Sequence, residues 1–282
     1  MTSLALGLTL LSVLLHASWN LISKRQRPGL SFFARASTLG MIPAVIVILP
    51  WQWRSLLTLP WSVWGWVMLT GFSQCVYLTG LAGAYRSGGM AQSYPLIRAL
   101  PVLLLAILVP LLFGTGWPPL LDWLGFVLVV GGLLLLAGDG PVAWGWVLLA
   151  ATGTVGYTLI DAHLLAALQL HLHIGPFQAG WLCMLLQAIA TAFWTLLGST
   201  LERHRHPVSL GAAAAAGIMM LITYGLVLCA FALVDNVAYV VAFRQLSIPL
   251  GMVMAVLFLS ERPARQHWYA MLPLLAGLWL LH

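Results

Sequence analysis

The hydrophobic and polar positions along the chain form ten long apolar stretches separated by short polar connections. Most are close to the ~20 residues that a helix needs to cross a membrane. The stretches cover residues 3–22, 30–49, 60–82, 92–113, 122–138, 142–163, 175–198, 211–234, 236–259 and 268–282. This pattern predicts an all-α membrane protein with ten transmembrane helices.

The composition agrees with a protein embedded in a lipid bilayer. Apolar residues make up 62% of the chain and charged residues only 6%, against ~25% charged residues in soluble domains. The net charge of +6 comes from basic residues scattered over predicted loops, so no nucleic-acid partner is expected. Three cysteines, Cys75, Cys183 and Cys229, lie inside predicted spans without metal-ligand spacing. We therefore expect no disulfide framework, no metal site and no cofactor.

The two halves of the chain resemble each other at a constant offset of 146 positions (244 minus 98). At this offset Arg98-Ala99-Leu100 aligns with Arg244-Gln245-Leu246, and Gly131 aligns with Gly277. The offset predicts two repeats of five helices, residues 1–138 and 142–282. Because five is odd, the second repeat must insert upside down relative to the first, as in many secondary transporters with a substrate site between the halves. A chance match between leucine-rich helices is the alternative.

Polar residues follow single faces of four predicted helices, at spacings of three and four residues. These stripes are Ser12, His16, Trp19, Asn20 and Ser23; Thr70, Ser73, Gln74 and Tyr77; Thr154, Tyr157, Thr158 and Asp161; and Gln187, Thr191, Trp194 and Thr195. Such faces are costly in lipid, so the first four helices of each repeat are expected to surround a cavity. The fifth helix of each repeat is almost free of polar atoms and is expected to be scaffold. Hydrogen bonding between helices, at ~0.6 kcal/mol per bond, is the other explanation of each stripe.

Two arginines, Arg98 and Arg244, lie well inside apolar stretches. A mid-span arginine costs about 2.5–3.5 kcal/mol on insertion, so each is expected to face water, a partner or a substrate. A guanidinium binds carboxylates and phosphates through two parallel hydrogen bonds, which predicts an anion site for a carboxylate, phosphate or phosphonate. The other interpretation is a structural pin, in which arginine binds carbonyls freed by neighbouring prolines.

Proton coupling has two candidates in the sequence. His16 is interpreted as the only histidine deep in a span, and its neutral pKa suits proton transfer. Asp161 is placed near the end of the sixth helix, and no acidic residue is expected to be clearly buried. Either His16 or Asp161 couples transport to protons, or the protein is a facilitator without proton coupling.

The candidate chemistry is that of binding rather than catalysis. No metal cluster, no nucleophile paired with a base and no pair of carboxylates indicates an enzyme. The predicted function is secondary transport by alternating access, with export of small metabolites such as amino acids or other compounds that carry a carboxylate or phosphonate. A flippase for lipid-linked substrates is the alternative, and the protein is expected to be a monomer or homodimer. The predicted substrate-binding residues are Arg98, Arg244, His16, Trp19, Asn20, Gln74, Tyr77, Tyr94, Tyr157 and Tyr239.

Several motifs resemble the EamA branch of the drug/metabolite transporter superfamily over essentially the whole chain. They are His16-Ala17-Ser18-Trp19-Asn20, Tyr94-Pro95-Leu96-Ile97-Arg98-Ala99, Phe243-Arg244-Gln245-Leu246-Ser247 and Ser260-Glu261-Arg262-Pro263. The resemblance implies a multi-pass carrier of the inner membrane, often an exporter. The Gly-Glu that follows the fourth helix in many relatives appears here as Gly114-Thr115, which departs from the family pattern.

Two arguments about orientation disagree. Eight basic residues lie in predicted loops opposite the termini, and only Arg54 lies on the side of the termini; the eight are Lys24, Arg25, Arg27, Arg86, Arg203, Arg205, Arg262 and Arg265. The positive-inside rule therefore predicts termini outside the cytoplasm. The family resemblance implies termini in the cytoplasm, so the orientation stays open.

Overall fold

The computed structural model describes residues 2–26, 29–87, 90–137, 142–202, 208–259 and 265–281. Regular structure within these ranges is entirely helical. The helices are α1 (Ser3–Arg25), α2 (Leu30–Leu57), α3 (Trp61–Ser87), α4 (Met90–Phe113), α5 (Leu120–Ala137), α6 (Trp144–Leu172), α7 (Pro176–Thr200), α8 (Leu210–Phe231), α9 (Val237–Phe243), the 3-10 helix η1 (Arg244–Leu246), α10 (Ser247–Leu259) and α11 (Arg265–Leu280).

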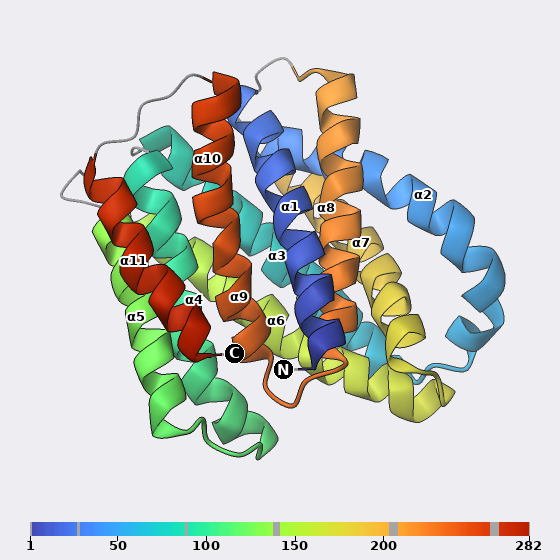
Figure 1. Ribbon diagram of the computed structural model, residues 1–282. Coiled ribbons are helices and arrows are strands. Elements are labelled where there is room, and N and C mark those ends of the chain that lie inside the picture. The colour runs from blue at the N-terminus through green and yellow to red at the C-terminus, as the bar shows by residue number, and fades with distance from the viewer. Residues whose placement is uncertain are drawn as a thin grey trace.

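The helices are those of a multi-pass membrane protein. Within the described ranges, nine helical segments are long and apolar enough to cross a bilayer, one of them running from α9 through η1 into α10 as Val237–Met254. The tenth predicted stretch forms α11, whose 16 residues fall short of the ~20 that a full crossing needs. The count of ten crossings therefore stays a prediction. The two chain ends lie at the same end of the bundle (Figure 1).

Exposed tryptophans gather at both ends of the bundle, as expected for side chains at the membrane–water interface. Trp51 and Trp61 are 84% and 89% exposed and lie where α2 and α3 meet, at the end of the chain termini (Figure 1). Trp144 is exposed at the start of α6, at the opposite end. The lipid-facing surface between them carries exposed leucines and valines.

The sixth helix is longer than its apolar stretch predicts, because α6 continues to Leu172. Asp161 consequently lies ~25 Å along the helix from its start and ~17 Å from its end, at 1.5 Å per residue, and is fully buried. The expectation that no acidic residue is buried was wrong. His163 also lies within α6, exposed and stacked against Trp66 at 4.8 Å, so His16 is not the only histidine inside a span.

The ninth predicted helix is interrupted at the arginine it carries. Pro249 has no N–H to give to the carbonyl of Gln245, and its ring crowds that carbonyl. The chain accordingly tightens into η1 at Arg244–Leu246 before α10 begins. The fourth helix stays continuous although Pro95, Pro101 and Pro110 lie inside it.

Packing between the helices pairs the two halves of the chain. The helix α3 packs on α6 and α7, while α8 packs on α1 and α2. On one flank α5 lies beside α11 (Figure 1). These two run antiparallel, since Gly125 meets Gly277 and Leu281, whereas Gly132 meets Ala270 and Leu274.

Glycine permits the closest of these approaches. A methyl group on Gly217 of α8 would lie 2.0 Å from the carbonyl oxygen of Ala36 in α2. One on Gly71 of α3 would lie 2.5 Å from the Cβ of Ala190 in α7. Backbones at both crossings therefore touch without an intervening side chain.

Candidate functional site

A cavity lies among α1, α2, α3, α6, α7, α8 and η1, so both halves of the chain contribute to it. The cavity volume is about 90 Å³, whereas a cavity of ~10–15 Å³ on the same measure already holds one water molecule. No lining residue among those described comes from α5 or α11, and none comes from α4, although the fourth helix was expected to surround the cavity too. Its wall includes His16, Trp19, Ser37, Gln74, Tyr77, Tyr157, Met184, Gln187, Thr191, Met220, Thr223, Tyr224 and Arg244.

Aromatic rings make up much of the cavity wall. Tyr157 contacts Tyr77 and Tyr224 edge to face, with ring centroids 5.9 and 5.6 Å apart. Trp19 packs edge-on against the His16 ring at 5.0 Å. Edge-to-face contacts hold such rings in fixed orientations. The wall therefore suits a flat or apolar molecule.

Three residues of the wall each carry a buried polar atom that has no hydrogen-bond partner among the described residues: His16 Nδ1, Thr223 Oγ1 and Arg244 Nε. Leaving such a group unpaired costs about 1–3 kcal/mol, and more for a charged group. The side chain of Arg244 is buried, at 6% exposure, and its guanidinium carbon lies 5.6 Å from the centre of the Tyr224 ring. Unpaired hydrogen-bonding groups and a positive charge therefore belong to residues of the same cavity wall.

Arg98 is held differently and does not line the cavity. Its Nε donates to Gln245 Oε1 at 3.0 Å, and its Nη2 donates to the Arg244 carbonyl at 3.4 Å. Gln245 in turn donates to the Val241 carbonyl at 2.7 Å. The guanidinium of Arg98 thus joins α4 to η1, where the backbone leaves the α-helical pattern.

A second hydrogen-bonded group holds the imidazole of His16. Its Nε2 lies 3.2 Å from the Tyr94 hydroxyl, and Asn20 donates to the same hydroxyl at 3.2 Å. The hydroxyl can accept from Asn20 and donate to Nε2 at once, and in that arrangement the proton of the neutral ring is on Nδ1. Tyr94 and Asn20 therefore orient the ring from behind the cavity wall.

Asp161 is the centre of a third group, directly behind the wall. Thr70 donates to its Oδ1 at 2.6 Å, and Gln187 and Tyr224 donate to its Oδ2 at 2.7 and 2.6 Å. Gln187 also donates to the Thr70 hydroxyl at 3.1 Å. Two of the donors, Gln187 and Tyr224, line the cavity as well.

The structure brings most of the predicted binding residues to one place. His16, Trp19, Gln74, Tyr77, Tyr157 and Arg244 line the cavity. Arg98, Asn20 and Tyr94 lie behind it, bonded as described. Tyr239 is elsewhere: its hydroxyl donates to Asp122, in a hollow beside the chain termini. Sequence reasoning missed Thr223 and Tyr224, whose only signal is a polar pair inside an apolar helix.

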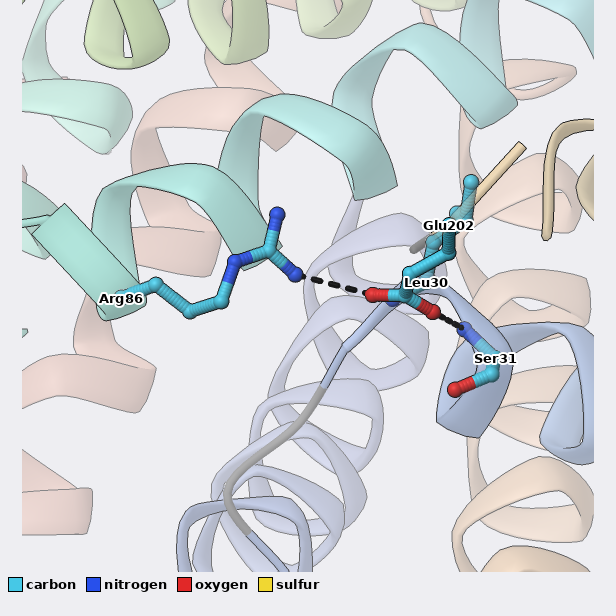
Figure 2. Close-up of polar contacts among 4 residues, drawn as sticks. All are labelled: Leu30, Ser31, Arg86 and Glu202. Atoms are coloured by element: carbon cyan, nitrogen blue, oxygen red, sulfur yellow. Dashed lines mark hydrogen bonds and ion pairs between the residues drawn. The ribbon is translucent and has the colours of Figure 1, made fainter. Parts of the chain in front are cut away.

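A polar cluster outside the membrane joins three segments at the end opposite the termini. Glu202 accepts from the backbone N–H groups of Leu30 and Ser31 at 3.2 and 2.8 Å, and from Arg86 Nη1 at 2.9 Å (Figure 2). Partial burial raises the pKa of Glu202, but the hydrogen bonds from Ser31 and Leu30 and the charge of Arg86 outweigh it, so the pKa lies below its ordinary value. The carboxylate caps the positive N-terminus of α2.

Side chains suited to a resident metal are not grouped in the described ranges, where no three histidines, cysteines or acids come together. Cys75, Cys183 and Cys229 are buried and unbridged. The described residues form a cavity with three hydrogen-bonded groups around it.

The comparisons with known proteins bear on the fold. No protein-family model matches the chain, and no curated protein does. A solved crystal structure of another protein is similar to 99% of this chain and 96% of its own, with a TM-score of 0.70 and 17% sequence identity. The chain therefore has a helical membrane fold that a solved structure shares over nearly its whole length.

Proposed function

We propose that the chain is a secondary transporter for small organic anions, which bind in the cavity by their carboxylate or phosphonate group. The observation that carries this is the buried Arg244, a residue of the cavity wall whose Nε has no described hydrogen-bond partner, together with His16 Nδ1 and Thr223 Oγ1 of two other wall residues, which also have none. An anion that bridges these groups offsets the cost of leaving them unpaired. Amino acids carry the same carboxylate and are included as substrates, although most of them are zwitterions without a net charge.

The proposal divides the two arginines between the two interpretations open at the sequence level. Arg244 is the ligand-binding arginine, because its Nε has no described partner. Arg98 is the pin, because it already binds a side-chain amide and a carbonyl. The binding set is therefore His16, Thr223 and Arg244 among the rings of Trp19, Tyr77 and Tyr157.

Alternating access needs two halves that exchange roles, and four observations support an inverted repeat. Packing of α3 on α6 and α7 is mirrored by packing of α8 on α1 and α2. Gly71 and Gly217 stand 146 positions apart and form equivalent close crossings. Arg98 contacts Arg244, its counterpart at the same offset, as residues near a two-fold axis do. The flanking helices α5 and α11 are antiparallel.

The same proposal includes ten crossings in two five-helix repeats and membership of the EamA branch, on the motifs quoted above. The cavity wall comes from the first helices of each half, and the fifth elements stand aside, as that organisation requires. The inner membrane and net export are the expected location and direction.

The test is ligand-dependent stabilisation of the purified protein in detergent, because a bound ligand raises the unfolding midpoint by mass action. Benzoate and phenylphosphonate are the anionic probes; benzyl alcohol and benzylamine are the neutral and cationic probes of similar size. We expect stabilisation by an anion and none by the other two. Equal stabilisation by all four, or none by either anion, overturns the proposal.

The matched variants are Arg244→Gln and Arg54→Gln, which make the same chemical change inside the cavity and at the exposed end of α2. Loss of a charged hydrogen bond of about 2 kcal/mol weakens anion binding ~30-fold. We expect this for Arg244→Gln and no change for Arg54→Gln. Uptake of the best anion into proteoliposomes should follow the same order.

A further inference from the structure

Asp161 is a carboxyl group in the interior of the membrane-spanning part of α6, and anion binding does not use it. It is fully buried and bonded to three neutral groups, Thr70, Gln187 and Tyr224. Burial of a charge is costly even when hydrogen bonds satisfy it. A cost of this kind calls for a reason beyond packing.

At the positions that correspond by sequence offset, the other half of the chain carries apolar residues. At the offset of 146, the counterparts of Asp161, Thr70, Gln187 and Tyr224 are Leu15, Ala216, Met41 and Leu78. This step rests on the inverted repeat of the proposed function. In such a repeat, the first half forms the same helix packing without any of the four polar side chains. Replacement of buried polar networks by apolar side chains is often neutral or stabilising. The cluster is not needed to hold α6 against its neighbours.

The cluster accommodates both protonation states of the carboxyl group. The ionised form accepts its three bonds as they stand. When one carboxylate oxygen gains a proton, its new O–H can donate a hydrogen bond to the Thr70 or Tyr224 hydroxyl, since a hydroxyl is both donor and acceptor. A helical threonine can then turn its own proton to the carbonyl four residues earlier. Only Gln187 is restricted to donating through its nitrogen.

A metal ion does not fit the same group. Around an octahedral ion with bonds of ~2.0–2.1 Å, adjacent oxygens lie ~2.9 Å apart. The Thr70 and Tyr224 oxygens lie only 2.6 Å from the carboxylate oxygens, so those pairs are joined by a shared proton. The ligand of this site is therefore a proton.

Tyr224 connects this group to the anion site. Its hydroxyl is bonded to Asp161, and its ring lies beneath the guanidinium of Arg244 at 5.6 Å and against Tyr157. A change in the hydrogen bond between the Tyr224 hydroxyl and Asp161 therefore shifts the ring that lies beside Arg244. Gln187 makes a second connection, since it bonds Asp161 and lines the cavity.

Other ionisable groups near Asp161 come from several helices. Cys183 of α7 and Tyr224 of α8 face it, and Tyr157 lies one turn away on α6. His163 is on the exposed face of α6. From α3, Thr70 faces it and Tyr77 lies against Tyr157; α4 carries Arg98 and Tyr94, bonded to Gln245 and His16. Among the described residues the carboxylate is hydrogen-bonded to neutral groups and to no Lys, Arg or His, so a proton is the species that neutralises it.

We propose that Asp161 is the proton-binding group that couples the carrier to a proton gradient, with Tyr224 as the link to Arg244. One proton from the cavity adds to a carboxylate oxygen, and no other bond is made or broken. Protonation removes a negative charge from the neighbourhood of the bound anion and so favours its binding. Proton and anion therefore travel together, and net export requires an outward anion gradient that exceeds the inward proton gradient.

The test begins with the proton alone, so that it does not depend on the identity of the substrate. Infrared difference spectra of the folded protein, recorded during a pH titration, should contain a protonated-carboxyl band that Asp161→Asn lacks. Asp122→Asn is the matched control and should keep the band. Absence of any band that depends on Asp161 overturns the proposal, whether or not anions bind.

The second measurement tests the link. Benzoate should move the midpoint of the Asp161 band to higher pH in the wild type, and Tyr224→Phe should keep the band but lose most of that shift. A band that benzoate does not move in a protein that benzoate stabilises also overturns the proposal. If Asp161→Asn fails to fold, Thr70→Val carries the test, because loss of its bond must displace the band.

Failure of the proposed function has a different signature. In that case no anion stabilises the wild type and Arg244→Gln has no effect. The presence or absence of the Asp161 band does not depend on that outcome. A proteoliposome assay completes the design. Asp161→Asn should retain anion exchange at equal pH and lose accumulation driven by a pH difference.

Discussion

Replacing Arg98 and replacing Arg244 should change the free energy of unfolding in opposite directions. Methionine preserves much of the length of arginine without its charge, so Arg98→Met and Arg244→Met are matched perturbations. Arg98→Met deletes a charged hydrogen bond of 3.0 Å, worth about 1.5–3 kcal/mol, and leaves Gln245 Oε1 without its donor. Arg244→Met deletes a buried group whose Nε is unpaired.

The free energy of unfolding should therefore fall by about 2 kcal/mol for Arg98→Met and rise by about 1 kcal/mol for Arg244→Met. For 282 residues with an unfolding entropy of ~2.1 cal/mol/K per residue, 1 kcal/mol corresponds to ~2 °C, so the unfolding midpoints of the two variants should differ by roughly 5 °C. The ligand-free protein is the sample, because a bound anion would reverse the second effect.

Three buried cysteines supply the assay. Cys75, Cys183 and Cys229 are unbridged and buried, so a thiol-reactive fluorophore labels them as the protein unfolds on heating. Arg54→Met, at an exposed position, should shift the midpoint by less than about 0.5 kcal/mol. If Arg244→Met lowers the midpoint as far as Arg98→Met does, then Arg244 is a second pin and the anion site loses its main support.

Further expectations concern packing, pH and topology. Gly217→Val should abolish the folded yield, because its Cβ would lie 2.0 Å from a carbonyl oxygen, whereas Gly65→Val, with nothing within 4 Å, should be tolerated. The lowered pKa of Glu202 contributes stability above the ordinary value of 4.5, and that contribution is lost as pH falls through the lower folded value. Glu202→Gln should therefore flatten the acid side of the midpoint-against-pH curve, and an unchanged curve would contradict the capping role. Reporters fused before Ser3 and after Leu281 should be active on the same side; opposite sides would mean an odd number of crossings.

Helix positions could largely be predicted from hydrophobicity. The predicted stretch 92–113 and the helix Met90–Phe113 end at the same residue, and 211–234 differs from Leu210–Phe231 by three residues at most. Apolar runs report where lipid begins and ends, because each buried backbone group must be bonded within its own helix.

Hydrophobicity does not report where a helix stops in water. The segment after His163 is rich in leucine and alanine, which continue a helix readily, so α6 extends to Leu172. This extension changes Asp161 from a residue near a helix end to one inside the bundle. The pattern of prolines was equally ambiguous, since α4 accommodates three of them while Pro249 follows a break.

The cavity could be predicted in part. Stripes on the first, third and sixth predicted helices indicated His16, Gln74 and Tyr157 correctly as residues of one wall. Which polar groups satisfy each other could not be read from a stripe, because spacing along one helix says nothing about its neighbours. The partners of Arg98 and Asp161 come from positions 147 and 26 to 91 residues away.

Where α5 crosses α11, the two helices are in direct backbone contact. A methyl group on Gly277 would lie 2.5 Å from the carbonyl oxygen of Gly125, so no rotamer change can loosen the contact. In the proposed transport cycle, a seam of this kind should keep one arrangement while the cavity changes the side to which it opens. It supplies a stationary reference: spin labels across the seam should report one constant separation during turnover, while labels on α1 and α8 record the motion.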